Sequence, residues 1–321
     1  MKKRTLGNTG FEVTELGYGS WPLCNNRNME YGEIDEKEAH ETVETYLNLG
    51  GNFIDTARGY GERPERVIGT VVKEKFNRED VYIATKSAAG QNVDSIPGLR
   101  KDLEESLRLL KTDYVDVFQL HQPPEDKETM NRVLDEMDRF KEEGKIRSLG
   151  ASIKGPDVSD ATVALCHQYI DTGRLGSIQI VYSILRQKLL PVIEKAEQSG
   201  VGVIVRTVLE SGLLTGKYKP GHTFSGLDQR RRYKADHLEF ILKTVEEIGR
   251  FAVRPPFENL AETAIRFALE PTGVSTIIVG AHRPENVKRN VKTAELPGLD
   301  SEVLEKLRKE YGDITEKANY Q

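Results

Sequence analysis

The feature that most constrains the fold of this chain is an alternation of short apolar runs with longer amphipathic stretches. The runs are rich in β-branched and aromatic residues, as buried strands are, and the stretches between them carry apolar residues at helical spacing. The expected strands cover residues 15–21, 52–55, 81–86, 115–121, 146–152, 177–182, 201–207 and 275–280. The expected helices cover residues 36–49, 63–75, 96–110, 128–143, 157–170, 188–199, 259–269 and 285–293.

Eight strand–helix units predict an α/β fold, a closed (β/α)8 TIM barrel, in preference to an open sheet in two domains. The length of 321 residues would allow two domains, but α/β barrels of this length form one. No Pro- or Ser-rich linker and no change of composition divides the chain. We therefore expect residues 1–321 to form a single barrel domain.

Three segments lie outside the repeat. Residues 3–14 read as an N-terminal β-hairpin with its turn at 7–10, and residues 300–311 read as an extra C-terminal helix. A long insertion, 208–258, follows the seventh strand and contains a further expected helix from about 228 to 251. Because it leaves from the carboxyl end of a barrel strand, this insertion is expected to be a lid over a cofactor or substrate.

Composition narrows the class of partner. A net charge of -5 gives no broad basic surface for nucleic acid. Cys24 and Cys166 form no CxxC pair and the six histidines form no His-x3-His motif, so neither a metal site nor a disulfide framework is expected. The basic start of the chain is not followed by an apolar segment, and no apolar run is long enough to span a membrane. These features favour a cytoplasmic protein.

Reactive side chains stand at the ends of three consecutive expected strands. Asp55, Lys86 and His121 close the second, third and fourth strands, and Tyr60 follows Asp55 in a loop flanked by glycines. A single residue of this kind is more often part of a salt bridge or a barrel wall. Because parallel strands deliver their carboxyl ends to one rim, these residues together predict a reactive site. A lysine ammonium beside a tyrosine favours the phenolate, so we expect Lys86 to lower the pKa of Tyr60 toward the range of a general acid–base that protonates a carbonyl oxygen.

The sequence around these residues resembles the aldo-keto reductases. The resemblance extends over nearly the whole chain and rests on these motifs: Leu16-Gly17-x-Gly19, Phe53-Ile54-Asp55-Thr56-Ala57-x-x-Tyr60-Gly61, Ile83-Ala84-Thr85-Lys86, Leu120-His121-x-Pro123, Glu143-Gly144-Lys145-Ile146-Arg147, Leu149-Gly150 and Gly212-x-Leu214-Thr215-Gly216-Lys217-Tyr218. It implies hydride transfer between a nicotinamide cofactor and an aldehyde, ketone, sugar or alcohol. By it, Tyr60 is the general acid–base, Lys86 and Asp55 tune it, and His121 orients the carbonyl. No GxGxxG opens a helix, so the cofactor is expected in the barrel loops and not in a Rossmann domain.

The same resemblance implies the cofactor contacts. Ser152 and Gln179 would bind the nicotinamide carboxamide and Tyr182 would stack on its ring, although Gln179 could equally be a polar barrel-layer residue and Tyr182 a core residue. The loop 207–217 would cover the pyrophosphate, and 280–290 would hold the adenosine end. The residues expected to make these contacts in the two loops are Thr207, Leu209, Gly212, Leu214, Lys217, Gly280, His282, Arg283, Asn286 and Asn290.

Several positions depart from the family pattern. Ile153 and Ser183 stand where Asn is common, and Val208 stands where Pro is frequent. At the adenosine end, His282 and Asn286 occupy positions that often hold an arginine for the 2′-phosphate. Arg283 could substitute for it, because a guanidinium binds phosphate bidentately. The expected cofactor is therefore NADP, with NAD as the alternative.

The remaining expectations concern the substrate and other functions. Trp21 could form a wall of the substrate pocket. Arg58 either pairs with Glu62 or Glu65 or favours a hydroxylated or anionic small-molecule substrate. The run 230–232 is either a solvated helix face or a set of phosphate ligands. Two other functions stay open: a nucleotide-binding regulatory or redox-sensing barrel with negligible turnover, and a Schiff-base lyase built on Lys86.

Overall fold

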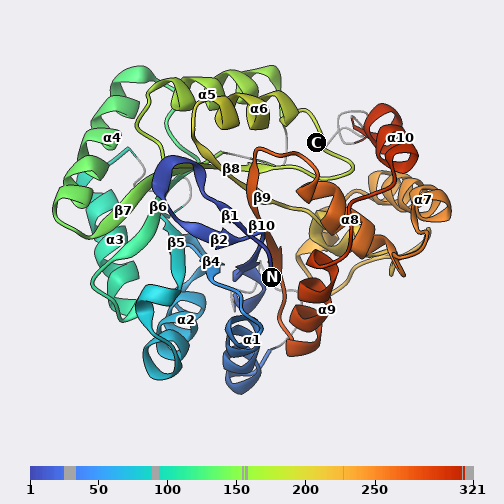
Figure 1. The fold of residues 1–321 in the computed structure, drawn as a ribbon, viewed down its shortest axis with the longest axis horizontal. Helices are drawn as coiled ribbons and strands as arrows, with labels where there is room; N and C mark the ends of the chain where they lie inside the picture. Colours follow the sequence, from blue (N-terminus) through green and yellow to red (C-terminus); the bar gives the residue numbers. More distant parts are fainter. Residues whose placement is uncertain are drawn as a thin grey trace.

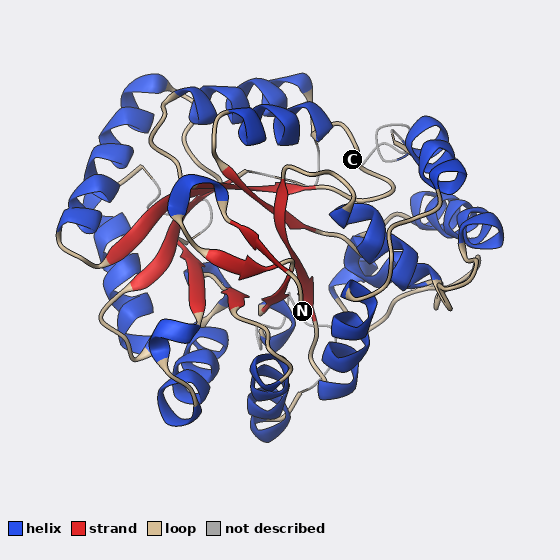
Figure 2. Ribbon diagram, in the orientation of Figure 1, coloured by secondary structure: helices blue, strands red, loops and turns tan. Residues whose placement is uncertain are grey.

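Eight parallel strands close into a barrel in the computed structural model, which describes residues 1–24, 34–88, 94–153, 155, 158–226, 228–312 and 314. The strand order around the barrel is β10-β3-β4-β5-β6-β7-β8-β9, and helices surround it (Figures 1 and 2). The strands are β3 (Leu16–Gly19), β4 (Phe53–Asp55), β5 (Tyr82–Lys86), β6 (Val115–His121), β7 (Ile146–Ser152), β8 (Ser177–Val181), β9 (Gly202–Arg206) and β10 (Val274–Gly280). The predicted (β/α)8 fold is confirmed.

One helix follows each barrel strand, after an insertion in the case of β9. These helices are α1 (Glu36–Asn48), α2 (Glu62–Lys75), α3 (Ile96–Leu110), α4 (Lys127–Glu142), α5 (Asp160–Asp171), α6 (Leu190–Gln198), α8 (Leu260–Leu269) and α9 (Pro284–Ala294). Several begin at a side chain that accepts a bond from the first turn, such as Asp35 on α1 and Asp126 on α4. Residue 157, where one helix was expected to begin, lies outside the described residues.

The N-terminal hairpin closes the end of the barrel at which the strands begin. Its strands are β1 (Lys3–Thr5) and β2 (Glu12–Thr14). Its apolar side chains pack against the lowest inward-facing residues of the barrel, in a cluster formed by Leu6, Phe11, Val13, Phe53, Ala84, Val117 and Ile204. Gly7 has φ +52°, and a Cβ there would lie 2.3 Å from the backbone nitrogen of Gly202, so the close approach requires glycine. The opposite end of the barrel is therefore the end available for a site.

The insertion differs in detail from its prediction. The helix expected from 228 to 251 is divided into a 3-10 turn, η6 (Gln229–Arg232), and α7 (Ala235–Ala252). The division arises because Asp228 caps the short turn and Tyr233 is extended. The predicted C-terminal helix is α10 (Ser301–Tyr311), and it lies beside α7 (Figure 1). The Tyr311 ring stacks on Phe251 of α7.

Several strand limits differ by one or two residues from the predicted ranges, and two of the carboxyl ends have a local cause. The first barrel strand stops at Gly19, because a 3-10 turn begins at Trp21 with Pro22 in its first positions. The seventh stops at Arg206, because Thr207 has φ +66° and cannot continue a strand.

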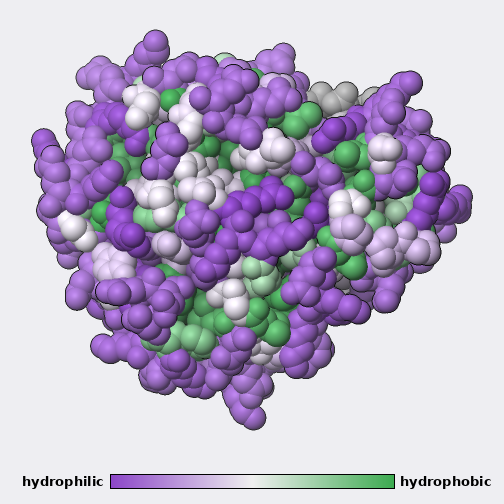
Figure 3. Space-filling model, in the orientation of Figure 1, coloured by the Kyte–Doolittle hydropathy of each residue, from purple (hydrophilic) through white to green (hydrophobic). Residues whose placement is uncertain are grey.

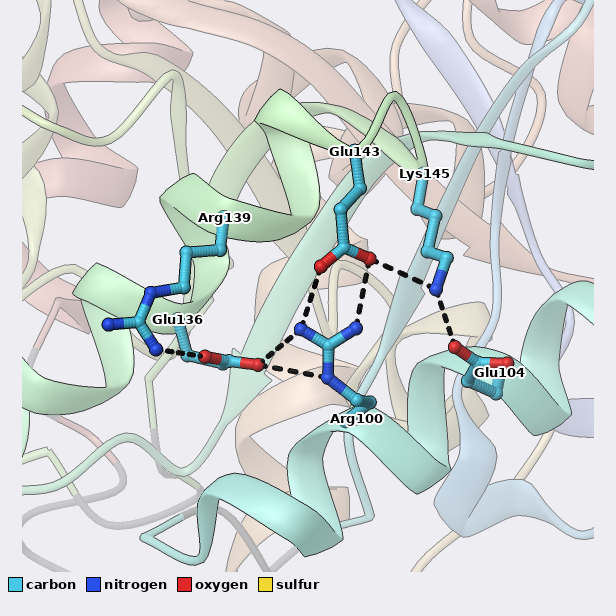
Figure 4. Close-up of polar contacts among 6 residues, drawn as sticks. All are labelled: Arg100, Glu104, Glu136, Arg139, Glu143 and Lys145. Atoms are coloured by element: carbon cyan, nitrogen blue, oxygen red, sulfur yellow. Dashed lines mark hydrogen bonds and ion pairs between the residues drawn. The ribbon is translucent and has the colours of Figure 1, made fainter.

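A charged network joins α3 to α4 on the outside of the barrel (Figure 4). The Arg100 guanidinium donates to Glu136 Oε1 at 2.6 Å and to Glu143 Oε1 at 2.8 Å, while Lys145 Nζ donates to Glu104 Oε1 at 2.6 Å. The Arg100 and Lys145 contacts lower the pKa of Glu143 to about 2. This network includes the start of the motif at 143–147, so that motif has a structural role.

The outer surface is largely hydrophilic on the face shown in Figure 3, with hydrophobic residues visible in separate groups between the hydrophilic ones. In the described part of the chain, no helix is long and apolar enough to cross a membrane.

Candidate active site

Four polar side chains meet at the carboxyl end of the barrel, as the sequence predicts. Asp55, Lys86 and His121 are the last residues of β4, β5 and β6, and Tyr60 lies in a 3-10 turn, η3 (Arg58–Tyr60), directly after β4. Lys86 Nζ lies 2.6 Å from Asp55 Oδ1, 2.8 Å from the Thr56 carbonyl oxygen and 3.3 Å from Tyr60 Oη. The lysine therefore joins the carboxylate to the phenol.

The second oxygen of Asp55 is held by two amides. Asp55 Oδ2 accepts from Gln179 Nε2 at 2.7 Å and from Gln119 Nε2 at 3.1 Å. Gln119 was not among the site residues predicted from the sequence. Its signal was available, because a residue two positions before His121 on the same strand points to the same side of the sheet. Three donors therefore hold the Asp55 carboxylate in place.

Electrostatics correct one expectation, since the pKa of Tyr60 is raised and not lowered. Burial raises the pKa of the Tyr60 phenol, and this effect exceeds the lowering by the Lys86 ammonium. Burial lowers the pKa of Lys86, but the charges of Asp55 and Tyr60 and its bonds to them raise it above the ordinary value. At neutral pH the site therefore holds a protonated phenol beside an ammonium ion.

The imidazole of His121 is neutral at physiological pH. Burial and the charges of Lys86 and Arg206 lower the pKa of His121 to about 3. Its ring lies edge-on to the Tyr60 ring, with 6.1 Å between centroids. Its Nδ1 is buried and has no hydrogen-bond partner in the described part of the chain. The ring therefore keeps a nitrogen for a ligand.

Trp21 lies where the sequence placed a pocket wall. Its ring packs edge-on against the Tyr60 ring at 4.7 Å between centroids. The buried indole Nε1 has no partner among the residues described. Because an indole N–H usually finds a partner when buried, this donor is suited to a bound molecule.

Arg58 pairs with a buried carboxylate of α2. Its guanidinium bonds to Glu65 of α2, whose side chain is fully buried and also accepts from Thr85 Oγ1 at 2.7 Å. Of the two roles considered, the ion pair is formed with Glu65, and the substrate contact stays a prediction. The pair fixes η3, and with it Tyr60, to α2 and β5.

The residues expected around the nicotinamide separate into two groups. Ser152 Oγ donates to Gln179 Oε1 at 3.2 Å, so both lie inside the barrel next to Asp55. Tyr182 does not lie inside the barrel. Its ring stacks on Phe267 of α8 with 5.5 Å between centroids, and its side chain is fully buried. With Gln179 facing inward, a residue three positions later faces outward. The expectation that Tyr182 stacks on the nicotinamide is wrong.

The loop after β9 is locally strained. Thr207, Glu210 and Ser211 all have positive φ, which is uncommon for residues with a side chain and costs of order 1–3 kcal/mol each. Glu210 is held by Ser183 Oγ and by Arg186, whose Nε lies 2.9 Å from Glu210 Oε1. In the six-residue turn η5 (Glu210–Thr215), Leu214 is buried, so only its backbone could meet a ligand, while Gly212 has φ +87°. Lys217 is exposed just beyond it.

The three arginines at 230–232 do not act alike. Arg230 is buried, and its Nη1 donates to the Ser211 carbonyl oxygen at 3.1 Å and to Tyr218 Oη at 2.8 Å. Arg231 and Arg232 are exposed. The solvated-face interpretation therefore holds for two of the three, and Arg230 supports the strained loop.

The expected adenosine end lies between β10, which ends at Gly280, and α9. Arg283 is exposed and pairs with Glu38 of α1 at 3.5 Å, and Asn286 accepts from Arg289. Burial lowers the pKa of His282, and the charges of Arg283, Lys217 and Arg230 lower it further. Lys217 and Arg230 belong to the insertion and Arg283 precedes α9, so the insertion lies near the start of α9. The first turn of α9 has no side-chain cap; Pro284 carries no N–H and the Asn286 N–H donates to the Arg283 carbonyl oxygen at 3.1 Å, so the Glu285 N–H is the donor left for an anion at this helix start.

Comparison with known proteins agrees with this geometry. The sequence profile of the Aldo/keto reductase family matches residues 15–311. Aldo-keto reductase YhdN of Bacillus subtilis (strain 168) is 26% identical over 295 residues, covering 88% of this chain and 86% of its own. NADH-specific methylglyoxal reductase of Escherichia coli (strain K12) is 26% identical over 325 residues, covering 94% of this chain and 96% of its own. Among solved structures, the holo form of aldo-keto reductase AKR11C1 from Bacillus halodurans superposes with a TM-score of 0.77 at 27% identity, over 98% of this chain and 99% of its own.

Proposed function

The chain belongs to the aldo/keto reductase family, and on that premise we propose that it transfers a hydride between NADP and a small carbonyl compound or alcohol. The observation that carries the proposal is the line of contacts from Asp55 through Lys86 Nζ to Tyr60 Oη. These contacts end at a phenol that keeps its proton at neutral pH, as a general acid must.

In this proposal, the nicotinamide supplies or accepts the hydride at the carbonyl carbon when it is bound. During reduction, Tyr60 Oη gives its proton to the carbonyl oxygen, and the resulting phenolate is stabilised by the Lys86 ammonium at 3.3 Å. Asp55 keeps Lys86 charged and oriented. Neutral His121, with its unpartnered Nδ1, can bond to the same carbonyl oxygen or to the alcohol it becomes. In the oxidation direction Tyr60 takes the proton back.

The donor set around the barrel mouth fits a dinucleotide. Lys217, Arg283 and the uncapped N-terminus of α9 supply positive charge and an N–H donor for phosphates. Ser152 and Gln179, which lie together inside the barrel, would supply a hydroxyl and an amide for the nicotinamide carboxamide. Leu209 and Gly212 of the strained loop, and Gly280, His282, Asn286 and Asn290 near α9, complete the proposed contacts.

The preference for NADP rests on Arg283 as the ligand of the 2′-phosphate. Its pairing with Glu38 leaves NAD as a second option, because a carboxylate at this position opposes a phosphate.

Steady-state oxidation of NADPH and NADH with a panel of small aldehydes tests the proposal. Tyr60→Phe is the matched control, since it removes one hydroxyl and leaves the ring between Trp21 and His121. We expect turnover by the wild-type protein to exceed that of Tyr60→Phe by roughly 10²–10⁴-fold, the usual contribution of a positioned acid. Equal rates, together with tight cofactor binding, would instead support a regulatory barrel with negligible turnover.

A further inference from the structure

Gln119 is a fully buried amide in the interior of the barrel, beside Asp55. It lies on β6, two positions before His121. The interior layers of such barrels are ordinarily filled by branched apolar side chains, which leave no polar atom without a partner. Val117, two positions earlier on the same face of β6, follows this rule in the apolar cluster beneath the site. An amide one level higher is stable only where both of its ends have polar partners.

Both ends of the Gln119 amide have such partners. Its Nε2 donates to Asp55 Oδ2 at 3.1 Å, and its Oε1 accepts from Gln179 Nε2 at 3.3 Å. Gln179 Nε2 also donates to Asp55 Oδ2 at 2.7 Å, so the three side chains form a closed triangle. They come from the alternate strands β4, β6 and β8, as the members of one barrel layer do. Because a carboxylate only accepts, both amides turn their NH2 groups toward Asp55, and the direction of each bond is fixed.

The barrel leaves room for this amide at Gly150. Gly150 is the neighbour of Gln119 in the register of β7 with β6. A Cβ on Gly150 would lie 2.8 Å from Gln119 Cγ, so a larger residue would push the amide aside. The Leu149-Gly150 motif therefore has a local reason at its second residue, which is the space that Gln119 occupies.

Gln119 differs from Gln179 in its other contacts. Gln179 Oε1 accepts from Ser152 Oγ at 3.2 Å, on the side where the nicotinamide is proposed to bind. In the described part of the chain, the side-chain hydrogen bonds of Gln119 are those to Asp55 and Gln179. Gln119 is thus the amide whose donor serves Asp55 alone.

We propose that Gln119 is a positioning residue for the reaction, which fixes the Asp55 carboxylate so that Lys86 Nζ stays beside Tyr60 Oη. Asp55 Oδ1 lies 2.6 Å from Lys86 Nζ, and a rotation of the carboxylate would move the ammonium away from the phenol, 3.3 Å from it. The inference rests on the proposed function, because this placement affects a rate only if Tyr60 transfers a proton. It predicts an effect on kcat and none on the KM of the aldehyde.

Gln119→Met tests the proposal, because it keeps the length of the side chain and removes its donor and its acceptor. We expect kcat for a small aldehyde at saturating cofactor to fall by roughly 10–100-fold, from the loss of a hydrogen bond to a charged group and the resulting displacement of the ammonium. The KM of the aldehyde should stay nearly unchanged. Ser177→Ala is the matched control, because Ser177 Oγ is buried beside Gly150 and has no hydrogen-bond partner among the residues described. It should leave kcat and KM at their wild-type values.

Gln119→Glu adds a readout that a purely structural role would not change. A protonated carboxyl has the shape of the amide and keeps one donor and one acceptor. Burial and the charge of Asp55 raise the pKa of the introduced carboxyl, and Lys86 opposes them less because it is already paired with Asp55. The variant should therefore match the wild-type kcat at about pH 5 and fall roughly 10–100-fold below it toward about pH 9, as the carboxyl ionises and repels Asp55.

Each other outcome overturns the proposal. An unchanged kcat in Gln119→Met shows that the amide does not position Asp55. A loss confined to the KM of the aldehyde or to the cofactor Kd assigns Gln119 to binding. A ratio of Gln119→Glu to wild-type kcat that does not change with pH assigns a structural role, and this ratio decides alone if Gln119→Met does not fold. If the wild-type protein is no faster than Tyr60→Phe, the proposed function fails, and urea unfolding of Gln119→Met, Asp55→Asn and the double variant still decides the contact, since additive losses reject it.

Discussion

Lys86 Nζ lies 2.6 Å from Asp55 Oδ1, and both side chains are sealed from solvent at the centre of the barrel mouth. A buried ion pair is a weak source of stability, because desolvation of both charges offsets their attraction. Its value here is geometric. The Asp55 carboxylate is fixed by Gln119 and Gln179, so the ammonium is held where it also reaches Tyr60 Oη.

Replacing one member of this pair should destabilise the protein more than replacing both. Lys86→Met leaves an unpaired buried carboxylate, and we expect it to lower the free energy of unfolding by about 3–5 kcal/mol. The double variant Lys86→Met/Asp55→Asn removes the buried charge and should recover part of that loss. Urea unfolding of the two single variants and the double variant measures the coupling. Additive losses would show that the pair does not interact energetically.

His121 should make stability fall at acidic pH. Folding lowers the pKa of its imidazole from 6.5 to about 3, so the folded protein resists a proton that the unfolded chain binds. The stability due to neutral His121 is complete above pH 6.5 and is lost as the pH falls toward 3. One proton gives a slope of up to about 1.4 kcal/mol per pH unit in this window.

His121→Asn is the control for this slope, because acidic groups also titrate in the same window. We expect the free energies of unfolding of the two proteins, measured with urea and plotted against pH, to run parallel above pH 6.5 and to converge below it. A constant difference between them would contradict a buried neutral imidazole. The rate profile of the wild-type protein should likewise show no ionisation of His121 near neutral pH.

Arg58 should prove to be a structural residue. Arg58→Met removes the partner of buried Glu65 and should cost about 3–5 kcal/mol at neutral pH. Burial already raises the pKa of Glu65, and loss of Arg58 raises it further. A carboxyl whose pKa is higher in the folded state destabilises increasingly as the pH rises, so the loss should be larger near pH 8 than near pH 5.

The double variant Arg58→Met/Glu65→Gln distinguishes a structural role of Arg58 from a role in substrate binding. The double variant has no buried charge at this position and should regain stability. If Arg58 contacted the substrate, the ratio of kcat/KM for anionic and neutral aldehydes would fall in the double variant. We expect that ratio to stay at the wild-type value.

The fold was predictable because its determinants are local. Each strand is a short apolar run, each helix is amphipathic, and parallel strands bring Asp55, Lys86 and His121 to one rim whatever their side-chain details. Helix ends and the insertion were less predictable. The break between η6 and α7 depends on the cap made by Asp228, which a period-based pattern does not detect.

The parts of the site that were not predicted depend on contacts between distant segments. Arg58 had two neighbouring carboxylates, and only the packing of α2 against β5 selects Glu65. The pKa of Tyr60 is raised because the phenol is buried, and the sequence does not show how deeply it is buried. The position of Tyr182 could have been predicted. Side chains alternate between the two faces of a strand, so a residue three positions after the inward-facing Gln179 faces the surrounding helices.

The choice between NADP and NAD should depend on Glu38 and Arg283. The carboxylate of Glu38 lies 3.5 Å from the Arg283 guanidinium and both are solvent-accessible, so a 2′-phosphate competes with Glu38 for the arginine. Glu38→Gln frees the guanidinium and removes a repulsive charge, and we expect it to lower the KM for NADPH by roughly 3–10-fold, as expected for a partly screened charge contact. Arg283→Gln should raise the KM for NADPH and leave that for NADH nearly unchanged. Steady-state kinetics with both cofactors, at low and high salt, measure these effects. If Arg283→Gln alters the two KM values equally, the 2′-phosphate is bound elsewhere.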